Sequence, residues 1–110
     1  MVAITSVETL QPIGETDHFR NKSYAVADID RIVEDLGVFI TTLANFTSFV
    51  MKVGQKVEAE FIGADGTAVD PSKLRDVAII VPAGQRIQAL VTVKTAATDT
   101  FVVMNIEDLD

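Results

Sequence analysis

The only histidine of the chain lies in a segment that carries charges of both signs, Glu15–Lys22. His18 follows Asp17 directly, and Arg20 and Lys22 come shortly after it. An imidazole beside a carboxylate can act as a general acid or base, and basic side chains can hold an anion. However, adjacent side chains of an extended loop point apart, and no nucleophile or third orienting group can be named. We interpret His18 as a solvated loop residue. The alternative is a concave site that binds a small anionic molecule through His18, Arg20 and Lys22.

Two pairs of acidic residues have spacings that occur in enzymes. Asp28 and Asp30 have the D-x-D spacing with which metal-dependent transferases hold a divalent cation. A helix that starts here explains both residues, one as its cap and one as a first-turn acid. Glu58 and Glu60 would lie about 6.5–7 Å apart on one face of a strand, between the two separations that glycosidases use. A solvated sheet face explains them without catalysis.

Local motifs for catalysis or cofactor binding are missing. The segment 63–66, with two glycines and an aspartate, lacks the alternating oxygen ligands of an EF-hand and the Lys-Ser/Thr ending of a P-loop. We predict a hairpin turn there. G-x-S-x-G, H-E-x-x-H and the dinucleotide fingerprint are also absent from the sequence. The sequence therefore predicts no catalytic residue, no metal site and no cofactor.

Composition argues against further classes of protein. The chain has 110 residues and a net charge of −7, and its nine basic residues are scattered singly, so we expect no nucleic-acid binding. It contains no cysteine, which excludes disulfide frameworks, thiolate metal sites and cysteine nucleophiles. The first residues have no basic segment and meet an acid at Glu8, so we expect synthesis in the cytoplasm without a signal peptide.

The one stretch that invites a membrane assignment lies between Asp35 and Lys52 and carries no charge. It is about 16 residues long and contains several threonines, a serine and an asparagine, whereas a spanning helix needs about 20 mostly apolar residues. We do not expect this stretch to cross a membrane.

Strand patterns dominate the rest of the chain. Residues 2–7 predict an edge strand, and the alternation over 57–61 predicts a strand with one solvated face. The continuous apolar run 77–81 is typical of a strand covered on both faces. Residues 85–95 alternate again, and we predict that they pair with 101–106 as a hairpin. Strands about ten residues apart with turns between them predict a mainly β domain: an antiparallel sandwich, a jelly-roll-like sheet or a small barrel.

One short amphipathic helix is predicted near residues 28–36. Asp28 can cap it and Gly37 can end it. The apolar side chains between them have helical spacing: Ile29, Ile32, Val33 and Leu36. The following stretch, 38–53, is open between helix and strand, because its polar residues have helical spacing while its β-branched and aromatic content is typical of strands.

The chain carries more apolar surface than a small domain can enclose. We predict a single domain over residues 1–110, with a polar loop at 14–23 and an acidic, frayed tail at 107–110. Apolar residues make up 48% of the sequence, whereas a domain of this size buries only about 60–70% of its surface. An ordinary core or a self-association surface can explain the uncharged run. Its candidate residues for self-association are Phe39, Ile40, Leu43, Phe46, Phe49, Val50 and Met51.

These observations favour a structural or interaction protein over an enzyme. We predict a small β-rich subunit that associates with itself, and with other subunits, in a larger symmetric assembly such as a virus particle, a ring or a scaffold. The negative charge would keep such a subunit soluble before assembly. The alternative is a ligand-binding module or a small enzyme whose site lies in the loop Glu15–Lys22.

Overall fold

The computed structural model describes residues 2–109, apart from the side chain of Thr47, and consists almost entirely of strands. Within these residues the helical segments are three short 3₁₀ turns, η1 (Ser23–Ala25), η2 (Leu43–Asn45) and η3 (Pro71–Lys73), and none has the length or apolar character to span a bilayer. The strands are β1 (Val2–Gln11), β2 (Gly14–Asp17), β3 (Arg31–Ile40), β4 (Phe46–Val53), β5 (Lys56–Phe61), β6 (Arg75–Val81), β7 (Ile87–Val93) and β8 (Thr98–Asp108).

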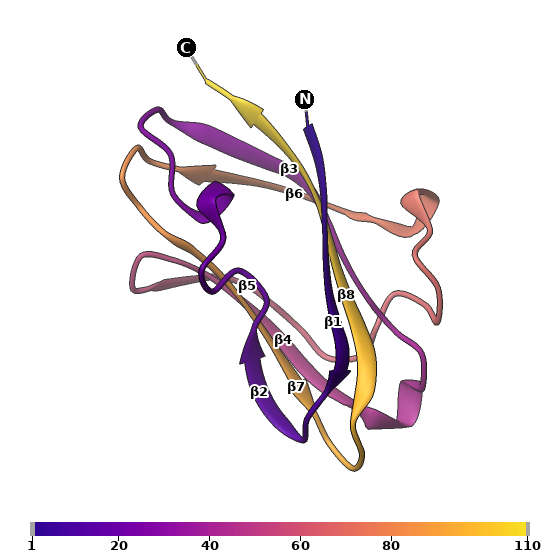
Figure 1. Cartoon of the computed structure of the whole chain (residues 1–110). Helices are drawn as coiled ribbons and strands as arrows, with labels where there is room; N and C mark the ends of the chain where they lie inside the picture. Colours follow the sequence, from indigo (N-terminus) through magenta and orange to yellow (C-terminus); the bar gives the residue numbers. More distant parts are fainter. Residues whose placement is uncertain (1, 110) are drawn as a thin grey trace.

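The strands form two antiparallel sheets of four, in the orders β1-β8-β3-β6 and β2-β7-β4-β5. The pairings are nested along the chain: β1 pairs with β8, β2 with β7, β3 with β6 and β4 with β5. This is the topology of a jelly roll, in which one long antiparallel hairpin is folded over into two layers. The prediction of a mainly β, antiparallel two-layer architecture is confirmed (Figure 1).

The prediction of a helix near residues 28–36 is wrong, because this segment leads into strand β3. A β-bulge explains the error. Val33 pairs with Ile106 of β8 and Asp35 pairs with Asn105, so Glu34 between them has no partner on β8. The bulge shifts the inward alternation by one residue, and Val33 and Leu36 both reach the core. The residues before and after the bulge therefore alternate in opposite phase, and the apolar side chains of this segment recur with the spacing typical of a helix.

Gly37 ends no helix but lies in the middle of β3. A Cβ atom at this position would lie 2.5 Å from Cδ2 of Leu74, which belongs to the connection between β5 and β6. The missing side chain lets that connection approach the outer face of the first sheet. Residues 38–53, for which the sequence allowed either helix or strand, are mainly strand: they form the end of β3, the turn η2 and then β4.

Two predicted strand arrangements are also wrong. Strands β7 and β8 do not form a hairpin, since β7 pairs with β2 and β4 while β8 pairs with β1 and β3. The run 77–81 belongs to β6, an edge strand whose Ile80 is exposed while Ile79 and Val81 are buried. Its apolar outer residues are uncovered because no layer packs on that side.

Three local predictions differ from the structure in smaller ways. The predicted polar loop 14–23 begins with strand β2, so the loop itself starts at His18. Glu107 and Asp108 are not frayed but pair with β3 at the end of β8. The segment 63–66 is no hairpin turn, because it belongs to the long connection between β5 and β6, where Gly66 forms a parallel bridge with Phe39.

The core lies between the two sheets and is built from the inward residues of all the longer strands. The connections divide between two ends of the sandwich. The antiparallel pairing places the β1–β2, β3–β4 and β7–β8 connections at one end, which we call the loop end, comprising residues 10–14, 41–45 and 94–97. Both chain termini lie at the opposite end (Figure 1).

Candidate functional site

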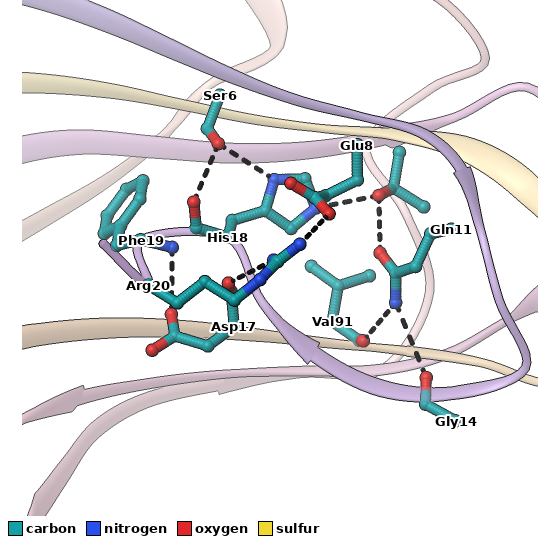
Figure 2. A network of polar contacts seen from close by, with 10 residues as sticks. Ser6, Glu8, Gln11, Gly14, Asp17, His18, Phe19, Arg20 and Val91 are labelled. Atoms are coloured by element: carbon teal, nitrogen blue, oxygen red, sulfur yellow. Dashed lines mark hydrogen bonds and ion pairs between the residues drawn. The ribbon is translucent and has the colours of Figure 1, made fainter. Parts of the chain in front are cut away.

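A network of buried polar side chains lies where β1, β2 and β8 meet (Figure 2). At its centre is His18, which is fully buried and not solvated as the sequence predicted. Its Nδ1 atom lies 3.2 Å from Oγ of Ser6, and its Nε2 atom lies 2.7 Å from Oγ1 of Thr100. Thr100 Oγ1 in turn donates to Oε1 of Gln11 over 2.6 Å, and Gln11 Nε2 donates to the carbonyl oxygen of Val91 over 2.6 Å.

Counting protons shows an unusual property of this network. Ser6 Oγ donates its only proton to the carbonyl oxygen of His18 over 3.0 Å, so the contact with Nδ1 needs a proton from the imidazole. The amide of Gln11 is oriented by Val91, so Thr100 uses its proton toward Oε1 and the contact with Nε2 also needs an imidazole proton. A neutral imidazole has only one ring proton. The four contacts are therefore satisfied together only by the imidazolium form.

The burial of His18 opposes that charged form. Burial lowers the pKa of His18 from its ordinary value of 6.5 to about 4. The negative charge of Glu8 on β1, the hydrogen bond with Ser6 and the charge of Asp17 act against this shift, while Arg20 adds to it. Near neutral pH the imidazole is therefore uncharged, and the network lacks one proton. Such a site joins two layers and responds to acid, but it has no solvent-exposed reactive atom.

The structure does not bring the alternative ligand residues together. His18 points inward, whereas the Arg20 guanidinium binds Oε1 of Glu8 at 2.7 Å and the carbonyl oxygen of Asp17 at 2.8 Å. Lys22 is exposed two residues further along. No cavity of ligand size is found over residues 2–109. The predicted concave pocket in this loop is therefore not present in the described part of the chain.

The acidic pairs singled out in the sequence have structural partners or lie apart from other ligands. Asp30 Oδ1 accepts a hydrogen bond of 2.8 Å from the amide of Ala83 and so ties two connections together. Glu58 lies 3.3 Å from Nζ of Lys56 on the same strand. Within the described residues no three metal-ligating side chains gather. Asp28 and Glu60 are exposed.

Two further titratable features could not be found in the sequence, because they depend on long-range register. The first is the pair Asp35 and Asp76, which lie opposite each other on β3 and β6. Hydrogen bonds with Asn105 and with Asp76 lower the pKa of Asp35. The hydrogen bond with Asp35 and the negative charge of Asp35 raise the pKa of Asp76.

Arg31 at the start of β3 is the second feature. It is buried, and its Nη1 atom donates to the carbonyl oxygen of Tyr24 over 2.6 Å. Its Nε and Nη2 atoms have no partner among residues 2–109. Burial lowers the pKa of Arg31, and the charge of Asp108 acts in the opposite direction.

Most of the side chains proposed for self-association lie inside the subunit. Phe39, Ile40, Phe46, Phe49 and Met51 are all buried, and Val50 is half-buried. Leu43 is the exception, with 53% of its surface exposed at the loop end. The uncharged run therefore contributes little exposed apolar surface.

Exposed apolar side chains lie instead at the loop end. Leu10 near the end of β1 and Ile13 on the β1–β2 connection are 65% and 62% exposed, and they lie at the same end as Leu43. Ile62 is 85% exposed where the chain leaves β5, which ends beside the start of β4. The residues that define the loop end include only one charged side chain, Lys94.

The opposite end has a different character. Its longest connection, residues 18–30, carries Arg20, Lys22, Asp28 and Asp30. The connections that define the loop end thus carry less charge than residues 18–30, which the sequence could not show because these connections come from three separate parts of the chain.

Comparisons with models of known protein families, with curated proteins and with solved structures give no significant match.

Proposed function

We propose that this chain is a structural subunit that associates with copies of itself through its loop end. The observation that carries the proposal is the conformation of Leu10. Its φ angle is +48°, in the left-handed region, and its side chain is 65% exposed. A non-glycine residue in this region costs about 1–2 kcal/mol. A large apolar residue that is both strained and exposed has no benefit for the isolated subunit.

The strained conformation is held by a specific contact. The backbone N–H of Leu10 donates to Oδ1 of Asp99 over 2.8 Å, and the pairing of β1 with β8 shifts register between Glu8 and Gln11. This arrangement turns the Leu10 side chain outward beside the connection that carries Ile13. Strain that the surrounding structure enforces is typical of functional positions. We infer that the function is contact with another molecule.

The charge of the chain favours a second copy of the same chain as the molecule that contacts the loop end. Each subunit has a net charge of −7, so two copies repel each other over most of their surfaces. The connections that define the loop end carry one charge, that of Lys94, and the carboxylate of Asp99 beside them has the opposite sign, so two copies can approach there with little like-charge repulsion. Apolar side chains there would be removed from water on contact, which favours association by about 25 cal/mol per Å².

A virus particle, a ring or a scaffold is the proposed setting. Jelly-roll subunits occur in viral capsids, which is an analogy of fold only. An enzyme or a small-molecule binder is the second candidate, but His18 is buried and Arg20 is already paired, so the loop 15–22 gives it little support.

The test compares two glycine variants by sedimentation velocity at several concentrations. Leu10→Gly relieves the left-handed strain and removes the exposed side chain, so it should keep or raise the melting temperature while association weakens at least tenfold. Ile29→Gly, which removes an exposed apolar side chain at the opposite end, should leave association unchanged. Equal association of the wild type and Leu10→Gly would overturn the proposal.

A further inference from the structure

Strand β1 has an open edge. It is the outermost strand of its sheet and pairs with β8 without interruption from Val2 to Glu8. Apart from these bonds to β8, the backbone N–H and C=O groups of residues 2–9 have no partner within the described chain. A long strand edge with free backbone groups is a template for pairing with another strand.

The other three edges are protected in ways that β1 is not. Strand β2 is only four residues long. Strand β5 carries Lys56, Glu58 and Glu60, and such charges discourage pairing. Strand β6 is distorted by Ala78, whose φ angle is +52°, and by a register shift against β3. Over residues 2–7, β1 has none of these devices: it contains no charged residue, no proline and no bulge.

The outward side chains of β1 are small and uncharged. Ile4 packs against the core and Ser6 is buried, so the alternate residues Ala3, Thr5 and Val7 face outward, where all three are exposed. They lie beside Asn105, Val103 and Phe101 of β8. This part of the outer face is therefore free of charge and partly apolar.

We propose that β1 pairs antiparallel with β1 of a second copy about a twofold axis at Thr5, which joins two four-stranded sheets into one continuous sheet. This deepens the proposed self-association and rests on it. In this register Thr5 faces Thr5 of the second copy, and Ala3 faces Val7. A small residue thus meets a larger one at both ends of the interface, and a threonine pair lies at its centre, which is a favourable cross-strand combination.

Charge again favours a second copy over an unrelated strand. The only charged residue on β1 is Glu8, and its carboxylate already binds Arg20 of the same subunit at 2.7 Å. Two neutral edges of chains with a net charge of −7 can meet where most other surfaces repel. Twofold contacts are isologous, so one self-complementary strand is sufficient.

The two proposed surfaces have different roles. A strand-edge contact that closes around a twofold axis produces only a dimer, whereas the loop end is a separate surface that can join dimers to one another. A chain with both surfaces can build an assembly larger than a dimer. Loss of one contact should therefore leave the other measurable.

Disulfide trapping tests the register directly, because the chain contains no cysteine. Residues directly opposite in an antiparallel pair have Cα atoms about 4.5–5.5 Å apart, within the range of a disulfide. Under mild oxidation, Thr5→Cys should form covalent dimers at least tenfold faster than Val57→Cys, a matched exposed position on the β5 edge. Ala3→Cys and Val7→Cys should each cross-link slowly alone and rapidly when mixed.

The outcomes separate this inference from the proposed function. Cross-linking of Thr5→Cys that persists in the Leu10→Gly background supports the β1 pairing even if the loop end plays no part. Cross-linking no faster than that of Val57→Cys overturns the β1 pairing, whatever the wild-type mass. Faster cross-linking of Ala3→Cys alone than of Thr5→Cys contradicts the register. As a second measurement, Thr5→Lys should weaken dimer formation at least tenfold without changing the circular dichroism spectrum.

Discussion

The Nε2 atom of His18 lies 2.7 Å from Oγ1 of Thr100, although 82 residues separate the two in sequence. This contact joins the segment that follows β2, in one layer of the sandwich, to β8 in the other. Because Thr100 also donates to Gln11, one hydroxyl links the histidine to the β1–β2 corner that carries Leu10. The buried network is therefore in a position to stabilise the end of the molecule that we propose for association.

Folding stability should fall as the pH decreases from 6.5 to about 4. In this window the unfolded chain protonates its histidine, whereas the folded chain does not, because burial lowers the pKa of His18 to about 4. The unfolded state therefore binds more protons, and acid favours it. At about 1.4 kcal/mol per pKa unit, the loss amounts to about 3 kcal/mol over the whole window. Urea unfolding at pH 7.5, 5.5 and 4.5 measures it.

Carboxylates also titrate in acid, so the comparison needs a variant without the imidazole. His18→Gln keeps polar atoms in the site and should unfold with a free energy that changes less between pH 6.5 and 4.5 than that of the wild type. An identical pH dependence in both proteins would show that His18 is not responsible.

The hydroxyl of Thr100 should contribute strongly to the free energy of unfolding. Thr100→Val keeps the shape but leaves Nε2 of His18 and Oε1 of Gln11 without their buried partner, which should cost about 2–3 kcal/mol of unfolding free energy. Thr98→Val removes a hydroxyl that bonds Oγ1 of the exposed Thr41 at 2.7 Å, and water can replace it there. That control should cost about 1 kcal/mol or less. Equal losses would contradict the described network.

Substitutions in the uncharged run should separate core from surface. Phe49 is fully buried and stacks on Phe61 with ring centroids 5.7 Å apart, so Phe49→Ala should destabilise the fold by about 3–5 kcal/mol. Leu43 is exposed, and Leu43→Ala should change stability by less than about 0.5 kcal/mol while weakening association. Thermal melts combined with sedimentation velocity distinguish the two effects. A stable Phe49→Ala protein would place this residue outside the core.

The β5–β6 connection should be held to β3 by Asp65. Its Oδ2 atom accepts from the amide of Val38 over 2.8 Å, and its Oδ1 atom accepts from Nε of Arg75 over 2.6 Å. Asp65→Ala leaves the Val38 amide without a partner and should cost about 2 kcal/mol. Asp70→Ala, which removes only the local contacts with Ser72, should cost less. Hydrogen exchange at Val38 measures the loosening, and unchanged protection in Asp65→Ala would contradict the assignment.

Much of the β architecture could be predicted from local patterns, because residues 57–61 and 85–95 alternate with the period of a strand. The pairing could not be predicted in this way. The turn after β7 is short enough for a hairpin, yet β7 and β8 enter different layers, since each finds its partners among distant strands. The false helix at 28–36 arose from the bulge at Glu34, which depends on register with β8.

The candidate sites show the same limit. The sequence singled out His18 by its charged neighbours, but its burial results from contacts with Ser6 and Thr100 that no local pattern contains. No sequence pattern around Leu10 distinguishes it from its neighbours. Its left-handed φ angle, which only the structure gives, distinguishes it. The run 36–51 is uncharged and rich in apolar residues, yet inward alternation in β3 and β4 places most of its large side chains in the core.

The mass of the chain in solution tests the central claim of self-association most directly. Sedimentation equilibrium from low micromolar to near millimolar concentration should give a mass that rises above the 11.9 kDa of one chain and passes through that of a dimer. Leu10→Gly should shift the rise above the mass of a dimer to at least tenfold higher concentration. A mass of 11.9 kDa at every concentration and salt would contradict the account.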